Sequence, residues 1–249
     1  MHGPAMKHRA TSHNASQVDS HRPGSAGSKH VLGKALRHDG ESAGRGIASS
    51  ALVLAMDTAA TVGPLIGLGF FLRGARRMDG FRPMDNTLSQ TMQEGMSFSL
   101  GTFACGLSTL LLAHRLRSDE SVKSSVDVAA IRGLEATGYV ISMIGLTKWG
   151  FMKRAHIGIA GTYFLGSPIA VSAFGIDAAM RGLKIEGSEA IVAAAVAGAA
   201  FAVGYDARKQ VIPAAFEFSH AAALSLLEVT IAIERLWIPR LKKLGKVGA

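Results

Sequence analysis

Long stretches of apolar and small residues alternate with short charged segments along most of this chain, and this alternation limits how it can fold. Six such stretches lie between Ile47 and Pro239, and almost every charge in that region falls between them. They cover residues 47–72, 96–113, 133–147, 157–176, 190–205 and 211–239. A helix needs about 20 apolar residues to cross the hydrocarbon core of a bilayer. The pattern therefore predicts a protein that folds in lipid.

Helices are favoured over strands for all six stretches. The stretches are too long for strands, lack a period of two, and are rich in Ala, Gly and Leu rather than in β-branched residues. Backbone groups in lipid must also be satisfied within their own segment, which selects helices. We therefore expect an all-α, multi-pass transmembrane bundle of about six spans over residues 47–239, followed by a basic tail at 240–249. The third and sixth stretches are the weakest spans, because both contain charges.

Residues 1–46 differ in composition from the rest. They hold seven Lys and Arg residues against three acids, six of the nine histidines, and few large apolar side chains. Such a segment buries too little surface to fold alone, so we expect a disordered basic tail. An organellar transit peptide is an alternative, although Gly3-Pro4 interrupts an early amphipathic helix. The histidines lack the regular spacing of metal ligands.

The distribution of cations indicates an orientation. With six spans, the side that carries both termini collects 18 of the 27 Lys and Arg residues, and the opposite side collects 9. The positive-inside rule then places both termini on the cytoplasmic or matrix side of a bacterial or mitochondrial inner membrane.

Small residues at four-residue spacing form the clearest packing signal. Such residues let membrane helices approach closely, so that dispersion and weak hydrogen bonds hold them together. The stripes either pack within the bundle or face a partner subunit. They comprise Gly63 and Gly67 in the first stretch, Gly158, Thr162, Gly166 and Ala170 in the fourth, and Ala194, Gly198 and Ala202 in the fifth.

Four polar residues are candidates for functional positions inside the membrane. Asp57 lies about mid-span if the first helix begins at Ile47, unless the span starts only after it. Glu217, His220 and Glu228 lie in the sixth stretch, where the two glutamates share a helical stripe with Arg235. Charged groups in spans often mark ion or proton paths. The sixth stretch either crosses the membrane or lies along it as an amphipathic helix.

Known catalytic and metal-binding patterns are absent from the sequence. Glu217 and His220 have the spacing used in di-iron bundles, but that chemistry needs a second Glu-x-x-His pair, which the chain lacks. The single cysteine, Cys105, excludes an internal disulfide. No phosphate loop or nucleophile elbow occurs. The cations are spread over all loops without interleaved aromatics, so we expect no nucleic-acid partner, no cofactor and no metal.

Residues 63–146 resemble the small Gly-rich subunits of the mitochondrial inner-membrane protein translocases (the Tim family). The resemblance rests on a Gly-rich first span, the sequence from Gly95 to Phe103 that opens the second, the cationic stretch from Arg115 to Asp119, and a Gly-containing third span at 133–145. Arg132 and Glu135 depart from it, since the family prefers small residues there. The resemblance implies a mitochondrial inner-membrane location and a role in protein insertion or as an accessory subunit.

These observations favour a non-enzymatic protein. Packing motifs dominate and catalytic sets are missing, so we expect an accessory, assembly or translocation-type subunit of an inner-membrane complex. Its partners are then the lipid bilayer and other membrane subunits. A small carrier or channel that uses the intramembrane acids is the alternative, and a membrane-bound enzyme is the least favoured class.

Overall fold

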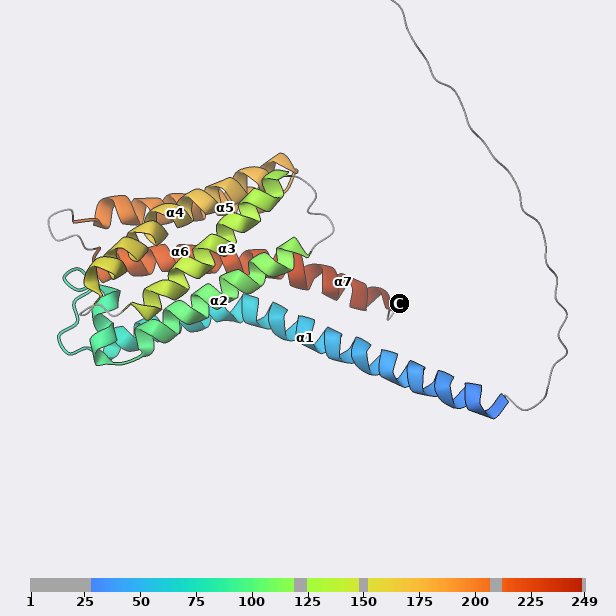
Figure 1. The fold of residues 1–249 in the computed structure, drawn as a ribbon. Helices are drawn as coiled ribbons and strands as arrows, with labels where there is room; N and C mark the ends of the chain where they lie inside the picture. The colour runs from blue at the N-terminus through green and yellow to red at the C-terminus, as the bar shows by residue number, and fades with distance from the viewer. Residues whose placement is uncertain (1–27, 119–124, 148–151, 207–211, 248–249) are drawn as a thin grey trace, which may run out of the picture. The chain divides into compact units, whose positions relative to one another are not determined.

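The computed structural model describes residues 28–118, 125–147, 152–206 and 212–247. The chain divides into two units, residues 1–49 and residues 50–249. The first unit contributes the beginning of helix α1, and the second holds a bundle of helices (Figure 1). Every regular element in the described ranges is helical. The all-α fold class predicted from the sequence is therefore confirmed for these residues.

In the described ranges, seven α-helices and two short helical turns follow one another. The elements are α1 (Ser28–Arg77), the 3₁₀ turn η1 (Leu88–Glu94), α2 (Ser97–Arg117), α3 (Ser125–Leu146), α4 (Lys153–Met180), α5 (Lys184–Gly204), α6 (Ala214–Ala232), the π turn η2 (Ile233–Trp237) and α7 (Ile238–Val247).

Among the residues that the structure describes, four helices are long and apolar enough to cross a bilayer. These segments are Ser50–Arg77, Ser97–Arg117, Lys153–Met180 and Glu186–Gly204, in α1, α2, α4 and α5. The third and sixth predicted stretches also form helices, α3 and α6, but neither meets this criterion. Both helices contain acidic side chains. The described residues therefore contain four candidate spans, and the predicted six spans are not confirmed.

Three boundaries differ from the sequence-based prediction. Helix α3 begins at Ser125, eight residues before the predicted start, and the predicted basic tail at 240–249 belongs to α7 as far as Val247. At the other end of the chain, α1 begins at Ser28, within the segment predicted to be disordered. Residues 1–27 of that segment lie outside the described residues.

From α1 to α6, consecutive helices of the second unit run in opposite directions, and α7 continues the direction of α6 (Figure 1). One end of the bundle therefore collects the α2–α3 and α4–α5 connections and the exit of α6. We call it the ion-pair end, after the charged contacts described below. The opposite end carries η1 and the connections that lead into α4 and α6 (Figure 1), and we call it the η1 end.

Large apolar side chains point outward from this bundle while polar ones lie inside it. Ile169 of α4 is 71% exposed and Val203 of α5 is 74% exposed. Asp57, Ser108, Ser167 and His220 are each at most 1% exposed. This arrangement suits lipid, because hydrocarbon solvates apolar side chains and leaves polar groups to find partners within the protein.

Helix α6 tolerates its polar residues because other elements cover it. It packs against α5, α2 and η1. On its buried side, His220 and Ile231 are almost completely enclosed. A polar side chain on that side of the helix therefore meets protein rather than lipid. Hydropathy alone cannot recognise such a helix.

Glycines set the distance between neighbouring helices. A methyl group added at Gly67 of α1 would lie 2.2 Å from the Cys105 sulfur and 2.8 Å from the carbonyl oxygen of Gly101, both in α2. In α2 and α3, Gly106 and Gly138 face one another so closely that a methyl group on either would meet the other's carbonyl oxygen within 3.0 Å. These helices approach backbone to backbone, as membrane helices with small residues do.

The π turn η2 joins α6 to α7 next to a proline. Pro239 lacks an amide hydrogen, and its ring would clash with the carbonyl of the residue four positions earlier, Arg235, in a regular α-helix. Arg235 lies inside η2, where the wider turn displaces that carbonyl. The helix thus continues past Pro239 into α7.

We expect Gly67→Leu to destabilise the bundle by about 3 kcal/mol, because the new side chain would force α1 and α2 apart. Gly69→Leu is the matched control, since a methyl group there meets no atom within 4 Å. It should be neutral or slightly stabilising, through the gain in helix propensity. Unfolding in mixed micelles of increasing dodecyl sulfate content measures the free energy of unfolding of both variants. Equal stability of the two variants would contradict the packing described here.

Candidate functional site

Asp57 lies within α1 as part of a buried ion-pair cluster. Its carboxylate is 1% exposed and accepts a hydrogen bond from Arg115 Nε of α2 at 2.6 Å. Arg240 Nη2 of α7 lies 2.9 Å from the other carboxylate oxygen. One turn along α1, Thr61 Oγ1 accepts a hydrogen bond from Trp237 Nε1 at 2.8 Å. Asp57 therefore joins three helices that are far apart in sequence.

Further ion pairs lie at the same end of the bundle. Arg235 of η2 donates to Glu186 of α5 at 3.0 Å, and Arg117 of α2 pairs with Glu135 of α3. Asp177 of α4 pairs with Arg181 at 2.5 Å. Each of these carboxylates is thus matched with an arginine, and the pairs between different elements hold helix ends together.

His220 lies at the centre of the bundle and is 0% exposed. Its Nδ1 lies 2.9 Å from the carbonyl oxygen of Ala197 in α5, and its Nε2 lies 2.9 Å from Ser167 Oγ in α4. A carbonyl only accepts, so Nδ1 carries the proton and donates it. The Ser167 hydroxyl at Nε2 also lies 2.7 Å from the carbonyl oxygen of Tyr163, one turn earlier in α4. Both ring nitrogens are occupied by contacts that connect α4, α5 and α6.

Glu228 faces a different neighbour from the other candidates on α6. Its Oε1 accepts a hydrogen bond from Thr109 Oγ1 of α2 at 2.7 Å. Glu217 instead accepts from the backbone amide of Leu88 in η1. The stripe predicted from spacing therefore does not form one polar path, because its members contact different elements. Among the described residues, no group of three His, Cys, Asp or Glu side chains converges as metal ligands do.

The predicted packing glycines fall into two sets. Gly63 and Gly67 lie against α2, where an added methyl group would meet Ser108 and Cys105 within 2.7 Å. For Gly158 and Gly166 of α4, no atom lies within 4 Å of such a group, and at Gly198 of α5 only Pro168 comes as close as 3.9 Å. The α4 glycines thus leave open space on this chain's own surface.

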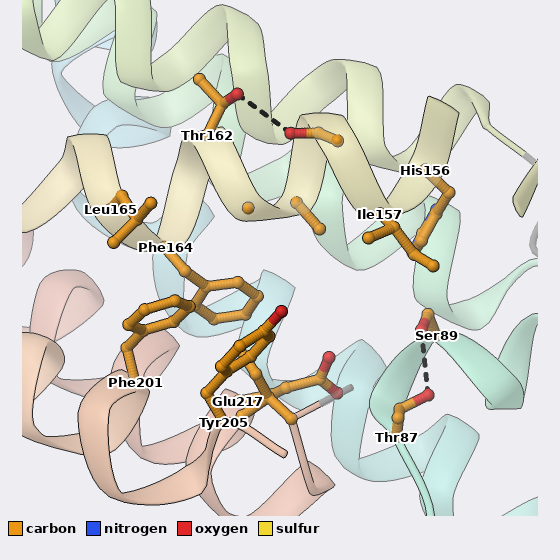
Figure 2. Close-up of a pocket in the computed structure, with 14 residues that line it drawn as sticks. Thr87, Ser89, His156, Ile157, Thr162, Phe164, Leu165, Phe201, Tyr205 and Glu217 are labelled. Atoms are coloured by element: carbon orange, nitrogen blue, oxygen red, sulfur yellow. Dashed lines mark hydrogen bonds between the residues drawn. The ribbon is translucent and has the colours of Figure 1, made fainter. Parts of the chain in front are cut away.

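A cavity of about 500 Å³ occupies part of that space, at the η1 end. Figure 2 shows its walls: α4 on one side, the end of α5 and the start of α6 on another, and η1 on a third. Its apolar lining includes an aromatic series in which Phe164 stacks on Phe201 and Phe201 on Tyr205, with ring centroids 6.2 and 5.4 Å apart. The polar lining comprises Thr87, Ser89, His156, Thr162 and Glu217.

Glu217 contributes the acidic group of this cavity. Its side chain is partly buried, and the Leu88 amide that it accepts from lies between Thr87 and Ser89 in the chain. The Thr87 and Ser89 hydroxyls are 3.0 Å apart and both are buried. The capping interaction of Thr87 with Gln90 fixes this turn. The carboxyl group and two hydroxyls therefore gather on one wall.

No family model, curated protein or solved structure matches this chain. The resemblance of residues 63–146 to the translocase family stays a prediction from those residues.

Sequence reasoning missed the partners of Asp57 and most of the cavity. Arg115 and Arg240 lie at helix ends, where cations were counted only for orientation. A search for arginines able to neutralise an intramembrane acid could have found them. No pattern in the sequence pointed to Phe201 and Tyr205 as cavity residues, since they become neighbours of Glu217 only when α5 packs on α6.

We expect Asp57→Asn to destabilise the bundle by about 3 kcal/mol, because two largely buried guanidinium groups lose their counter-charge. Asp85→Asn is the control, since Asp85 is exposed and its nearest cation, Arg82, lies 3.9 Å away. That change should cost less than about 1 kcal/mol. Unfolding curves in mixed micelles compare the two. A silent Asp57→Asn would show that the cluster contributes no stability.

Proposed function

We propose that this chain is a non-enzymatic integral membrane protein that serves as an accessory, assembly or translocation-type subunit of an inner-membrane complex. The observation that carries the proposal is that the polar groups inside the bundle bind one another or the backbone. Asp57, His220 and Glu228 all have partners within the bundle. Groups engaged in this way stabilise helix packing rather than receive a passing substrate.

The outer face of α4 supports a role in assembly. Gly166 has no neighbour within reach, and Ile169 on the same helix is highly exposed. In lipid, an open small-residue face lets a second helix approach closely. Gly67 and Gly138 already have such a neighbour, because each lies in close contact with helix α2 of the same chain. We therefore assign the part of the α4 face at Gly166 and Ile169, outside the cavity, to a neighbouring subunit.

Topology and charge support the proposed orientation. The first span begins and α6 ends at the ion-pair end of the bundle, as alternation of the helices requires. The segments assigned to this side hold 18 of the 27 Lys and Arg residues. By the positive-inside rule, we propose that this end faces the cytoplasm of a bacterium or the matrix of a mitochondrion.

A small carrier or channel is the second candidate, and the cavity beside Glu217 is the observation that favours it. Cavities of this size commonly hold small ligands. A transport path would also need to continue toward the ion-pair end. Leu224, between Glu217 and Glu228 on α6, is 4% exposed and belongs to the apolar core. The subunit role therefore fits the interior better.

We expect Gly166→Leu to release a partner subunit while the bundle itself stays folded, because the leucine would occupy the open α4 face. The protein is purified from its own membranes in mild detergent, and native mass spectrometry gives the stoichiometry of what accompanies it. Gly69→Leu, on the outside of α1, is the control and should retain the partner. Wild-type protein that purifies without any stoichiometric companion would overturn the subunit proposal.

For the carrier alternative, Glu228→Gln is the decisive variant. Glutamine keeps an acceptor for the Thr109 hydroxyl but removes the ionisable group. A structural role predicts that vesicles containing wild type or variant show the same proton and cation leak as protein-free vesicles, followed with entrapped indicator dyes. Flux through the wild type that disappears in the variant would instead establish a carrier or channel.

A further inference from the structure

We propose that the cavity beside Glu217 binds a cationic amphiphile, a molecule dissolved in the membrane with an apolar chain and an ammonium head group. The inference rests on the cavity alone and holds for either function proposed above. Its volume of about 500 Å³ lies within the range of small-ligand pockets. Three features of the lining select the ligand: its charge, its aromatic wall and its glycines.

The acidic lining of the cavity favours a ligand with a positive charge. Glu217 is the acidic residue of the cavity, and neither lysine nor arginine lines it among the described residues. Elsewhere in the bundle, carboxylates such as Asp57 and Glu186 are paired with arginines. The described contact of the Glu217 carboxylate is the Leu88 amide. A carboxylate in an apolar pocket is costly without a counter-ion. An ammonium group on the ligand supplies it, whereas a fatty acid would be repelled.

The aromatic wall suits the same head group. Phe164, Phe201 and Tyr205 form a continuous series along the cavity that Glu217 also lines (Figure 2). The negative face of an aromatic ring attracts an ammonium ion, most strongly where water is excluded. The Thr87 and Ser89 hydroxyls add hydrogen-bond acceptors next to the carboxylate. Together these groups surround a cation with acceptors and π faces.

The glycines of α4 make room for an apolar chain. Gly158 and Gly161 line the cavity, and a methyl group at either would meet no atom within 4 Å. The floor is buried, as at Phe164, while Leu165 at the rim is 54% exposed. The cavity therefore opens at the outer surface of the bundle, which faces lipid in the membrane. A chain entering from the bilayer lies along this apolar rim with its head group at Glu217.

Three probes of equal chain length test the proposal: tritiated decylamine, decanol and decanoate. Each is titrated into the full-length protein in nanodiscs of zwitterionic lipid, and binding to protein-free nanodiscs is subtracted. We expect saturable, one-to-one binding of decylamine, at least about tenfold tighter than that of decanol, as a charge-assisted hydrogen bond implies. Decanoate should bind most weakly. Equal binding of amine and alcohol, or the absence of any saturable amine binding, would overturn the proposal.

Two variants locate the probe. Glu217→Gln keeps an acceptor for the Leu88 amide, and it should weaken decylamine binding about tenfold while leaving decanol unchanged. Glu234→Gln, outside the cavity lining, is its control. Gly161→Leu should abolish binding of both probes by filling the cavity, whereas Gly69→Leu should not. Decylamine binding that survives both Glu217→Gln and Gly161→Leu would place the amine elsewhere and refute the assignment.

Discussion

Pairing of Asp57 with two arginines is the interaction on which the arrangement of this bundle depends. A carboxylate inside an apolar helix is stable only when the protein supplies its counter-charges. Arg115 and Arg240 do so from α2 and α7, at 2.6 and 2.9 Å. Because one group serves both arginines, the position of α1 is coupled to that of the C-terminal helix. Segments that could slide past one another in lipid are thereby held in one register.

The same requirement explains the difference between the core and the cavity. In the core, polar groups on α6 find partners on the helices that enclose it, as His220 does with Ser167 and Ala197. At the η1 end the enclosure is incomplete, since α4 presents glycines where other helices present side chains. Glu217 lies at that gap. A molecule from outside the bundle can therefore reach the Glu217 carboxyl group at this gap.

The helices themselves could be predicted from the sequence, because apolar composition over long stretches is a local property. All six predicted stretches form helices, whereas the number of spans depends on shielding by neighbours, which hydropathy does not contain. Small-residue spacing identified positions without revealing what they face: Gly67 packs on α2, while Gly158 remains open. The partners of Asp57 were missed for a related reason. Arg115 lies 58 positions away along the chain, and only the packing of α1 on α2 makes them neighbours.

The π turn before Pro239 gives the C-terminal part of the chain an unusual sensitivity to length. Each residue of an α-helix turns the chain by about 100°. The wide turn at Ile233–Trp237 sets the direction in which α7 presents its side chains, so that Arg235 meets α5 while Arg240 meets α1. Removing one residue there would rotate Arg240 away from Asp57. The number of residues in this short segment is therefore as constrained as the identity of the two arginines that it positions.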